Sequence, residues 1–230
     1  AFHKTQLTYF SFIYSWNLPD GFDLQVFLRG SSIVNFDFSR FNTPITPSSL
    51  VWAFGECSNL ETVDFTGITY CDRFSHCFRD SQNLRNFFGL ETLQWNDGVQ
   101  LDAMFYNCPK NMEEIDLSFI TCKVSSVPKF NNRGKVLKTV KMGFDMSNIT
   151  SFPNYMFADF FTLENLEMGK NIKCDITPIN RLFTQNKLTV QSLMNLINNL
   201  WDYSNDSETH TCTIGTTNLA KLTDEQIAIA

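Results

Sequence analysis

The side chains in this sequence that could act as nucleophiles or metal ligands are three histidines and seven cysteines. A cysteine nucleophile needs a thiolate held beside an imidazole, and only His76 neighbours a cysteine, Cys77. Adjacent side chains of a strand point to opposite faces, so the two residues make a poor catalytic dyad. A solvent-facing His76 beside a Cys77 packed in the core is the simpler interpretation.

The sequence offers equally little for metal or cofactor chemistry. Cys71, His76 and Cys77 could surround a zinc ion, but no Cys-x-x-Cys pair supplies the rest of a tetrahedral site. The chain has no phosphate-binding glycine loop, no nucleophile elbow and no His-Glu-x-x-His motif. We therefore expect no cofactor, no metal and no catalytic residues, and an enzyme ranks third among the functional hypotheses.

Composition narrows the class of protein. The 230 residues are 43% hydrophobic and 18% charged and include 23 Phe, so the chain can bury a substantial core. A net charge of −6 argues against nucleic-acid binding, which needs clustered Lys and Arg. No apolar run approaches the roughly 18 residues that span a bilayer, so we expect no membrane insertion in this segment. The odd number of cysteines indicates free, buried thiols.

A seven-residue pattern recurs along the chain: apolar, two polar, apolar, polar, apolar, small. Copies begin at Leu60, Met112, Leu137 and Leu163, with an earlier copy at Ile33 and a poorer one at Leu84. From position 60 onward the starts are separated by 24, 28, 25 and 26 residues. One such strand cannot bury its apolar face alone, but stacked copies can. Positions one, four and six should point into a shared core, and positions three and five outward from a parallel sheet.

Two further recurrences support this register. A Phe lies three residues before a residue that we expect to sit inside a turn, in the pairs Phe54 and Cys57, Phe78 and Ser81, Phe105 and Cys108, and Phe157 and Phe160. The cysteines Cys71, Cys122 and Cys174 follow their strand starts by 11, 10 and 11 residues. This spacing predicts a second ladder, built of thiols.

The pattern Phe-x-x-Cys-x-x-Leu-x-x-Val-Asp-Phe-Thr over residues 54–66 resembles the BspA-like leucine-rich-repeat family of bacterial surface and phage-associated proteins. The family's Met-Phe-x-x-Cys is complete at Met104 to Cys108 and partial elsewhere. The resemblance implies an α/β-type solenoid of irregular leucine-rich repeats with a parallel β-sheet and a C-terminal α/β cap. Residues 33–188 would form the solenoid, 1–32 an N-terminal cap or degenerate repeat, and 189–230 an incomplete helix-strand-helix cap.

The segments outside the repeats carry their own signals. Apolar residues on one helical stripe predict a helix over 189–201, and a strand over 209–215 and a capped helix start over 223–226 should follow. Near the start, alternation of Phe10, Phe12, Tyr14 and Trp16 predicts a half-buried strand before a turn at 18–21. Because the chain opens on Ala1 and closes within a predicted helix, we expect it to be a piece of a longer protein.

The candidate binding surface is the outward face of the sheet, where side chains of successive repeats stack about 5 Å apart. It would carry Asn35, Asp37, Thr62, Asp64, Glu114, Asp116, Thr139, Lys141, Asn165 and Glu167. Carboxylates recur at the fifth position, with Lys141 the exception, so the stripe could attract a cationic or hydroxyl-rich partner or a calcium ion. A merely solvated face is the alternative.

The functional expectation combines this surface with the family resemblance. The leading hypothesis is a non-enzymatic recognition or adhesion module exposed on a bacterial cell, with a protein or glycan on a host or neighbouring surface as its partner. The alternative is a structural or receptor-binding component of a bacteriophage particle, a tail, fibre or capsid decoration, which would place the chain in a virion among other virion proteins.

Overall fold

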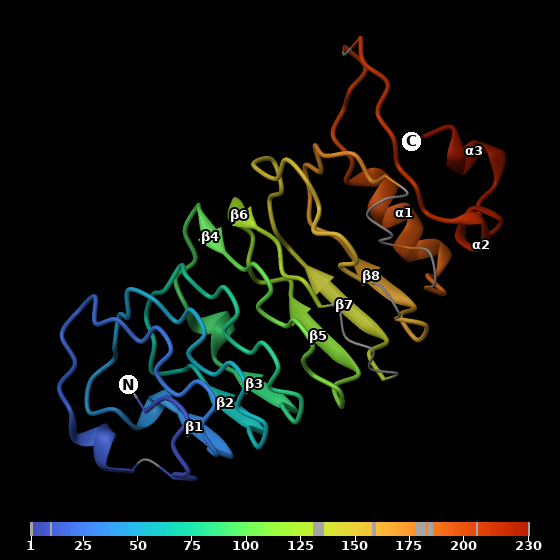
Figure 1. The fold of residues 1–230 in the computed structure, drawn as a ribbon. Coiled ribbons are helices and arrows are strands. Elements are labelled where there is room, and N and C mark those ends of the chain that lie inside the picture. The colour runs from blue at the N-terminus through green and yellow to red at the C-terminus, as the bar shows by residue number, and fades with distance from the viewer. Residues whose placement is uncertain are drawn as a thin grey trace.

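The chain forms a parallel β-solenoid, as predicted (Figure 1). The computed structural model describes residues 2–9, 11–130, 136–157, 160–177, 183, 186–205 and 207–229. Short strands from successive turns pair in parallel, and the chain winds steadily from its N-terminal to its C-terminal end (Figure 1). None of the described helices is long and apolar enough to cross a membrane.

Three small sheets follow the axis of the solenoid. The first contains β1 (Asn35–Asp37), β2 (Thr62–Asp64) and β3 (Asn86–Phe88), and the second contains β5 (Glu114–Leu117), β7 (Thr139–Met142) and β8 (Asn165–Glu167). A third sheet pairs β4 (Val99–Gln100) with β6 (Val124–Ser126). The helical segments are η1 (Ser11–Ser15), η2 (Phe38–Arg40), η3 (Leu90–Thr92), α1 (Val190–Asn198), α2 (Thr216–Leu219) and α3 (Asp224–Ile227).

The seven-residue pattern sets the register of the strands. Asn35 pairs with Thr62 and Thr62 with Asn86, so even the poorer copy at Leu84 is in register. Residues at pattern positions one, four and six are buried in the copies that start at 33, 60, 137 and 163. In the other two copies, Phe87 and Met112 are only partly buried. The shared core predicted from the repeat is therefore confirmed.

The sheet is interrupted once, which the sequence did not predict. Among the described strands β3 and β5 do not pair, so the strand side consists of two three-stranded sheets. The repeat between Leu84 and Met112 is the longest, at 28 residues. Part of the excess lies just before β5, where Phe105 precedes Met112 by seven residues, whereas Phe54 precedes Leu60 by six. Beyond this longer connection, β5 begins a new sheet.

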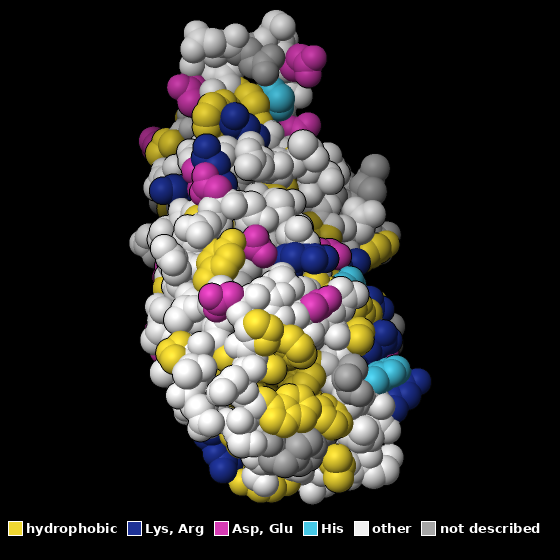
Figure 2. Space-filling view, turned by 90° about the vertical axis from the view of Figure 1, so that its left-hand side faces the viewer, with side chains coloured by type: hydrophobic (Ala, Val, Ile, Leu, Met, Phe, Trp, Pro, Cys, Tyr) yellow, Lys and Arg dark blue, Asp and Glu magenta, His cyan; other side chains and the backbone are white. Residues whose placement is uncertain are grey.

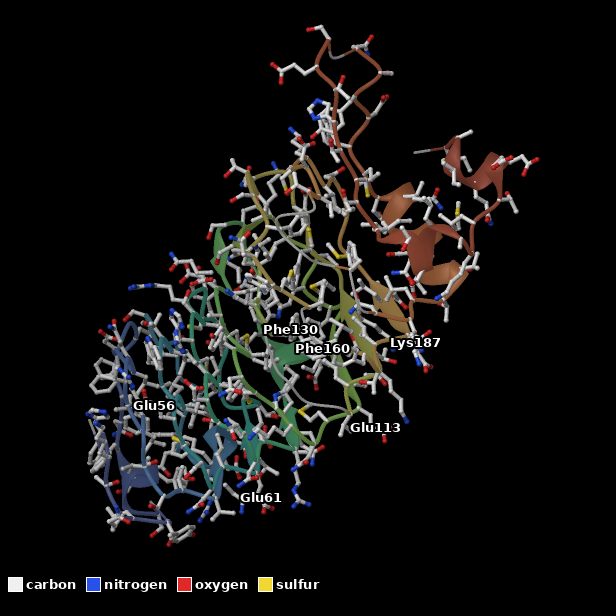
Figure 3. All side chains as sticks on the ribbon, turned by 45° about the vertical axis from the view of Figure 1, so that its right-hand side comes forward. Glu56, Glu61, Glu113, Phe130, Phe160 and Lys187 are labelled. Carbon is white, nitrogen blue, oxygen red and sulfur yellow. The ribbon has the colours of Figure 1, made fainter. Side chains whose placement is uncertain are left out.

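A stack of phenylalanine rings runs through the interior. Ring centroids of Phe54, Phe78, Phe105, Phe130, Phe157 and Phe183 follow one another at 6.0, 5.7, 5.8, 5.4 and 6.3 Å, with interplanar angles from 3° to 25°. Such distances and angles are typical of offset-stacked rings. All six side chains are buried, and Figure 3 shows Phe130 inside the coil of the ribbon. The repeat pattern identified four of these rings and missed Phe130 and Phe183.

The turns that hold the rings have an unusual backbone. Trp52, Glu56, His76 and Asp80 have φ between 59° and 63°, a left-handed conformation that is unfavourable for residues with a Cβ. Alternate N–H groups of these turns donate to carbonyls of the next turn, for example at Trp52 (3.1 Å) and Glu56 (2.7 Å). These bonds satisfy the backbone without strands. His76 and Cys77 therefore lie in such a turn, and the prediction that they occupy a strand is wrong.

The last strand, β8, is covered by α1. The Ser192 Oγ accepts the Leu166 N–H at 2.9 Å, and the Asn195 Oδ1 accepts the Met168 N–H at 3.0 Å. Side chains of the helix thus pair with backbone groups that a further strand would otherwise occupy. The predicted helix over 189–201 is confirmed over Val190–Asn198, and the Thr189 side chain accepts the Ser192 N–H at its start. Leu200 and Trp201 lie beyond its end, and Leu200 forms a bridge with Ile172.

Two other predictions outside the repeats are wrong. Residues 209–215 contain one bridge, Ile176 to Cys212, in place of a strand, and α2 follows. The N-terminal alternation forms η1 in place of a strand, because both Ile13 and Tyr14 are buried and consecutive inward residues do not fit a two-residue period. Phe10 and the side chain of Phe12 lie outside the described residues.

Two local predictions at the ends of the chain are confirmed. In the turn at 18–21, the Phe22 N–H donates to Pro19 at 3.2 Å and Gly21 has φ +74°. At the start of α3, the Thr223 and Gln226 side chains each accept the backbone N–H of the other residue. In both cases the sequence pattern that predicted the feature spans four residues.

Removing one ring from the middle of the stack should destabilise the fold strongly. We expect Phe105→Ala to lower the free energy of unfolding by about 3–5 kcal/mol, because the cavity opens between two stacked neighbours. Urea unfolding followed by circular dichroism measures the change. Phe161→Ala is the matched control, since that ring is 51% exposed and its loss should cost within about 0.5 kcal/mol. If the two substitutions lowered the free energy of unfolding equally, the ring stack would not be a main source of stability.

Candidate functional site

The ten side chains of the predicted binding face lie in two separate groups. Asn35, Asp37, Thr62 and Asp64 lie on β1 and β2, whereas Glu114, Asp116, Thr139, Lys141, Asn165 and Glu167 lie on β5, β7 and β8. All ten are exposed or half-buried. The structure thus brings together the six residues of the second group but separates them from the first by the interruption beside β3.

Three carboxylates of the stripe have a local structural role. Asp37 Oδ1 accepts from the backbone N–H of Ser39 at 2.9 Å, Asp64 Oδ1 from that of Thr66 at 2.8 Å, and Asp116 Oδ1 from that of Ser118 at 2.9 Å. Each bond closes a short turn at the end of its strand. The recurring Asp-x-Ser/Thr spacing carries this signal in the sequence. The fifth-position carboxylates therefore do not form a stripe of unengaged charges.

Lys141, the exception in the stripe, bridges two carboxylates of the preceding turn. Its Nζ lies 2.6 Å from Glu114 Oε1 and 3.5 Å from Asp116 Oδ2. The hydrogen bond to Glu114 is the main cause of the raised pKa of Lys141. Burial raises the pKa of Asp116, but bonds from Ser118 and the nearby Lys141 outweigh it and lower that pKa. The surface here is therefore mixed in charge.

A shallow depression of about 350 Å³ lies over the second group. Its floor is formed by β7 and β8, with Val140 and Leu166 beneath polar side chains. The wall toward the C-terminus comes from the first turns of α1. Residues that line it include five predicted ones, Glu114, Thr139, Lys141, Asn165 and Glu167, and four that the repeat pattern missed, Thr189, Gln191, Ser192 and Asn195. These four follow the last repeat, so periodicity alone could not place them on this face.

An exposed aromatic side chain borders the first group. Phe88 occupies the fifth position of the poorer repeat, is 50% exposed, and pairs in register with Asp64. A large apolar side chain is unusual at an outward position. The poor match of this repeat to the pattern is the only signal of it in the sequence.

The cysteines are arranged differently from the prediction. Cys71, Cys122 and Cys174 do not form a ladder, because the turns around Gln94 and Asp145 lie between them. Those intervening repeats carry Trp95 and Asn148 at the corresponding offset.

A different column of small side chains fills the inner turns. Cys57 N–H donates to Ser81 Oγ at 3.0 Å, and Cys108 Sγ donates to the Ser81 carbonyl at 2.8 Å. Cys57, Ser81 and Cys108 are all buried, which confirms that small residues sit inside the turns.

His76 is not arranged to activate Cys77. Its ring stacks on Trp52 with centroids 4.7 Å apart, and its Nε2 lies 3.6 Å from Asp102 Oδ2. Burial raises the pKa of the Cys77 thiol well above its usual range, which keeps the sulfur protonated. Within the described residues, no three His, Cys, Asp or Glu side chains are placed to hold a metal ion.

Comparisons with known proteins return no relative of this chain. No protein-family model matches it, and neither a curated protein nor a solved structure matches it significantly.

Substitutions at Asp64 separate structural from electrostatic roles. We expect Asp64→Ala to lower the free energy of unfolding by about 1 kcal/mol, because the bonds from the Thr66 N–H and hydroxyl are lost. Asp64→Asn keeps an acceptor oxygen and removes the charge, so it should remain within about 0.5 kcal/mol of the parent. Thermal unfolding of both variants checks this. A larger loss for the asparagine variant would show that the charge matters more than the turn.

The buried thiols should resist alkylation in the folded protein. Burial raises the pKa of Cys71 to about 12, whereas the thiol of an unfolded chain has a pKa of about 8.5. We expect iodoacetamide at pH 8 to modify half-buried Cys122 before Cys71 or Cys77, as mass spectrometry of digests would show. Rapid labelling of Cys71 in the folded protein would contradict its buried position.

The raised pKa of Cys71 also makes stability depend on pH. Because the folded state retains the Cys71 proton, the contribution of this thiol to stability is complete below about pH 8.5 and is lost as pH rises toward 12.

Proposed function

We propose that this chain is a non-enzymatic recognition module of the BspA-like leucine-rich-repeat type, displayed on a bacterial cell surface. It would bind a partner protein through the outward face of β5, β7, β8 and α1. In this proposal the segment from Thr189 onward is the C-terminal cap of the repeats, and α1 contributes both to closing the sheet and to the binding face.

The observation that carries the proposal is the depression between β7, β8 and α1. Acidic Glu114 and Glu167 lie on either side of basic Lys141, and the amides of Asn165 and Gln191 add donors and acceptors. Such a mixture suits the varied polar groups of a protein surface. The backbone below is held by paired strands, so the face is rigid before any partner arrives.

Repeat proteins generally bind through extended surfaces of this kind, because successive turns present side chains at a regular spacing. The cysteines also favour a non-enzymatic role, since the thiols of the inner turns are buried and protonated. The ion pairs at Lys141 also fix the arrangement of acidic and basic side chains on the face. A fixed charge pattern of this type favours complementary partners and speeds association.

Lys141 and Lys138 provide a matched test. Each pairs with a glutamate of the preceding repeat, Lys141 with Glu114 at 2.6 Å and Lys138 with Glu113 at 3.0 Å, but only Lys141 lines the depression. Partners would first be found by probing an array of host extracellular proteins with the purified chain. We expect Lys141→Glu to weaken a partner found there about ten-fold, as measured by surface plasmon resonance, and Lys138→Glu to leave it unchanged.

Two outcomes would overturn the proposal. If no protein on the array binds the folded chain, the recognition role fails. If both lysine variants lose binding equally, the partner does not use the face of β5, β7 and β8. Turnover of any substrate in a parallel hydrolase-substrate profile would instead favour an enzyme.

A further inference from the structure

Three shallow depressions join along a different side of the solenoid. The first, of about 270 Å³, lies at β6 and includes Asp102 and Ser125. It shares Thr150 and Ser151 with the second, of about 400 Å³. The second shares Lys173 with the third, of about 610 Å³. We call this row of adjoining depressions the groove; its lining residues lie between β6 and the segment that follows α1, apart from Asp102 just after β4.

Aromatic rings lie at the C-terminal end of this groove. Trp201 is 39% exposed, and the Lys173 Nζ lies 3.8 Å from the centroid of its ring. Tyr203 stacks on His210 with centroids 3.5 Å apart, and His210 Nδ1 lies 3.2 Å from Asp175 Oδ1. These contacts orient the rings, and because Lys173 covers one face of the Trp201 indole, a ligand would stack on the other face or displace the lysine side chain. Figure 2 shows hydrophobic, basic, acidic and histidine side chains gathered near the top of the molecule.

The side chains around Trp201 suit a sugar. A pyranose ring presents an apolar C–H face, which packs on an aromatic ring, and a rim of hydroxyls that both donate and accept hydrogen bonds. The third depression combines Trp201 with the Asp202 carboxylate, the Asn205 amide and the Ser207 hydroxyl. Carboxylate and amide oxygens accept from hydroxyls, while the amide also donates to them. The remainder of the groove continues with hydroxyls, notably Ser125, Thr150 and Ser151.

The charges of the groove disfavour an anionic chain. Asp102, Asp175 and Asp202 lie along it with two basic residues, Lys173 and His210. A sulfated, phosphorylated or uronate-rich polymer would meet more negative than positive charge.

The backbone of this side disfavours an extended peptide. The Val124 N–H donates to Asp145 at 3.1 Å, and the Met146 N–H donates to Lys170 at 2.9 Å. Neighbouring turns already use the groups that an added strand would need. An uncharged chain rich in hydroxyls fits these constraints better than a peptide does.

We infer that this groove binds a neutral oligosaccharide chain, with one sugar stacked on Trp201 and further sugars extending over Thr150 toward β6. The inference goes beyond the proposed protein-binding role, because it concerns other residues and another class of ligand. Each role can be present without the other.

The test begins with the whole chain on a glycan microarray that displays neutral and anionic oligosaccharides, together with a 12-residue peptide library. Disaccharide and hexasaccharide forms of the best neutral glycan are then titrated by calorimetry. We expect Trp201→Ala to weaken hexasaccharide binding at least about ten-fold. Trp201→Phe, which keeps a ring, should stay within about three-fold of the parent but lose any ligand-induced change in tryptophan fluorescence. Phe161→Ala, an exposed ring elsewhere, should change nothing.

Thr150→Ala tests the length of the groove. We expect it to weaken the hexasaccharide and not the disaccharide, since Thr150 lies in the two depressions beyond the one that contains Trp201. The inference is overturned if only anionic glycans or peptides bind, if no neutral glycan binds, or if Trp201→Ala binds like the parent. Neither loss nor retention of sugar binding would alter the Lys141 experiment, so the two roles are judged separately.

Discussion

Each turn of this solenoid must lay its backbone and its phenylalanine ring against those of the turn before, and the rest of the architecture depends on that constraint. Backbone bonds between turns set the spacing, and the rings from Phe54 to Phe183 stack at 5.4 to 6.3 Å within it. The bonds also hold residues such as His76 in left-handed conformations that would be unfavourable alone. Local strain and long-range packing are therefore coupled.

The same stacking creates the surfaces. Because turns repeat in register, a side chain at one pattern position lies beside its counterparts, which brings Asp116, Lys141 and Glu167 onto one face. Side chains in such a column form hydrogen bonds and ion pairs with one another, and a ligand must compete with these contacts. Asp116 closes a turn through Ser118 and approaches Lys141, so it serves the fold as well as the surface.

The sequence predicted the features that repeat and failed where a feature depends on a single turn. Strand register, buried positions and the start of α1 came from recurring or strongly local patterns. The thiol ladder failed because a recurrence in alternate repeats says nothing about the repeat between them, where Trp95 or Asn148 stands. The strand expected near Tyr14 failed because alternation over a few residues also fits a 3-10 helix that packs two consecutive residues inward.

By itself, the sequence determined that the chain coils into a parallel solenoid and which side chains of each repeat face in or out, since the periodic pattern encodes both. Tertiary structure decided where the candidate sites are. Gln191 joins Lys141 only because α1 lies across β8, and Trp201 joins Thr150 only through adjoining depressions on neighbouring turns. These contacts depend on how the non-repeating segments pack against the last turns, which the periodicity of the sequence does not encode.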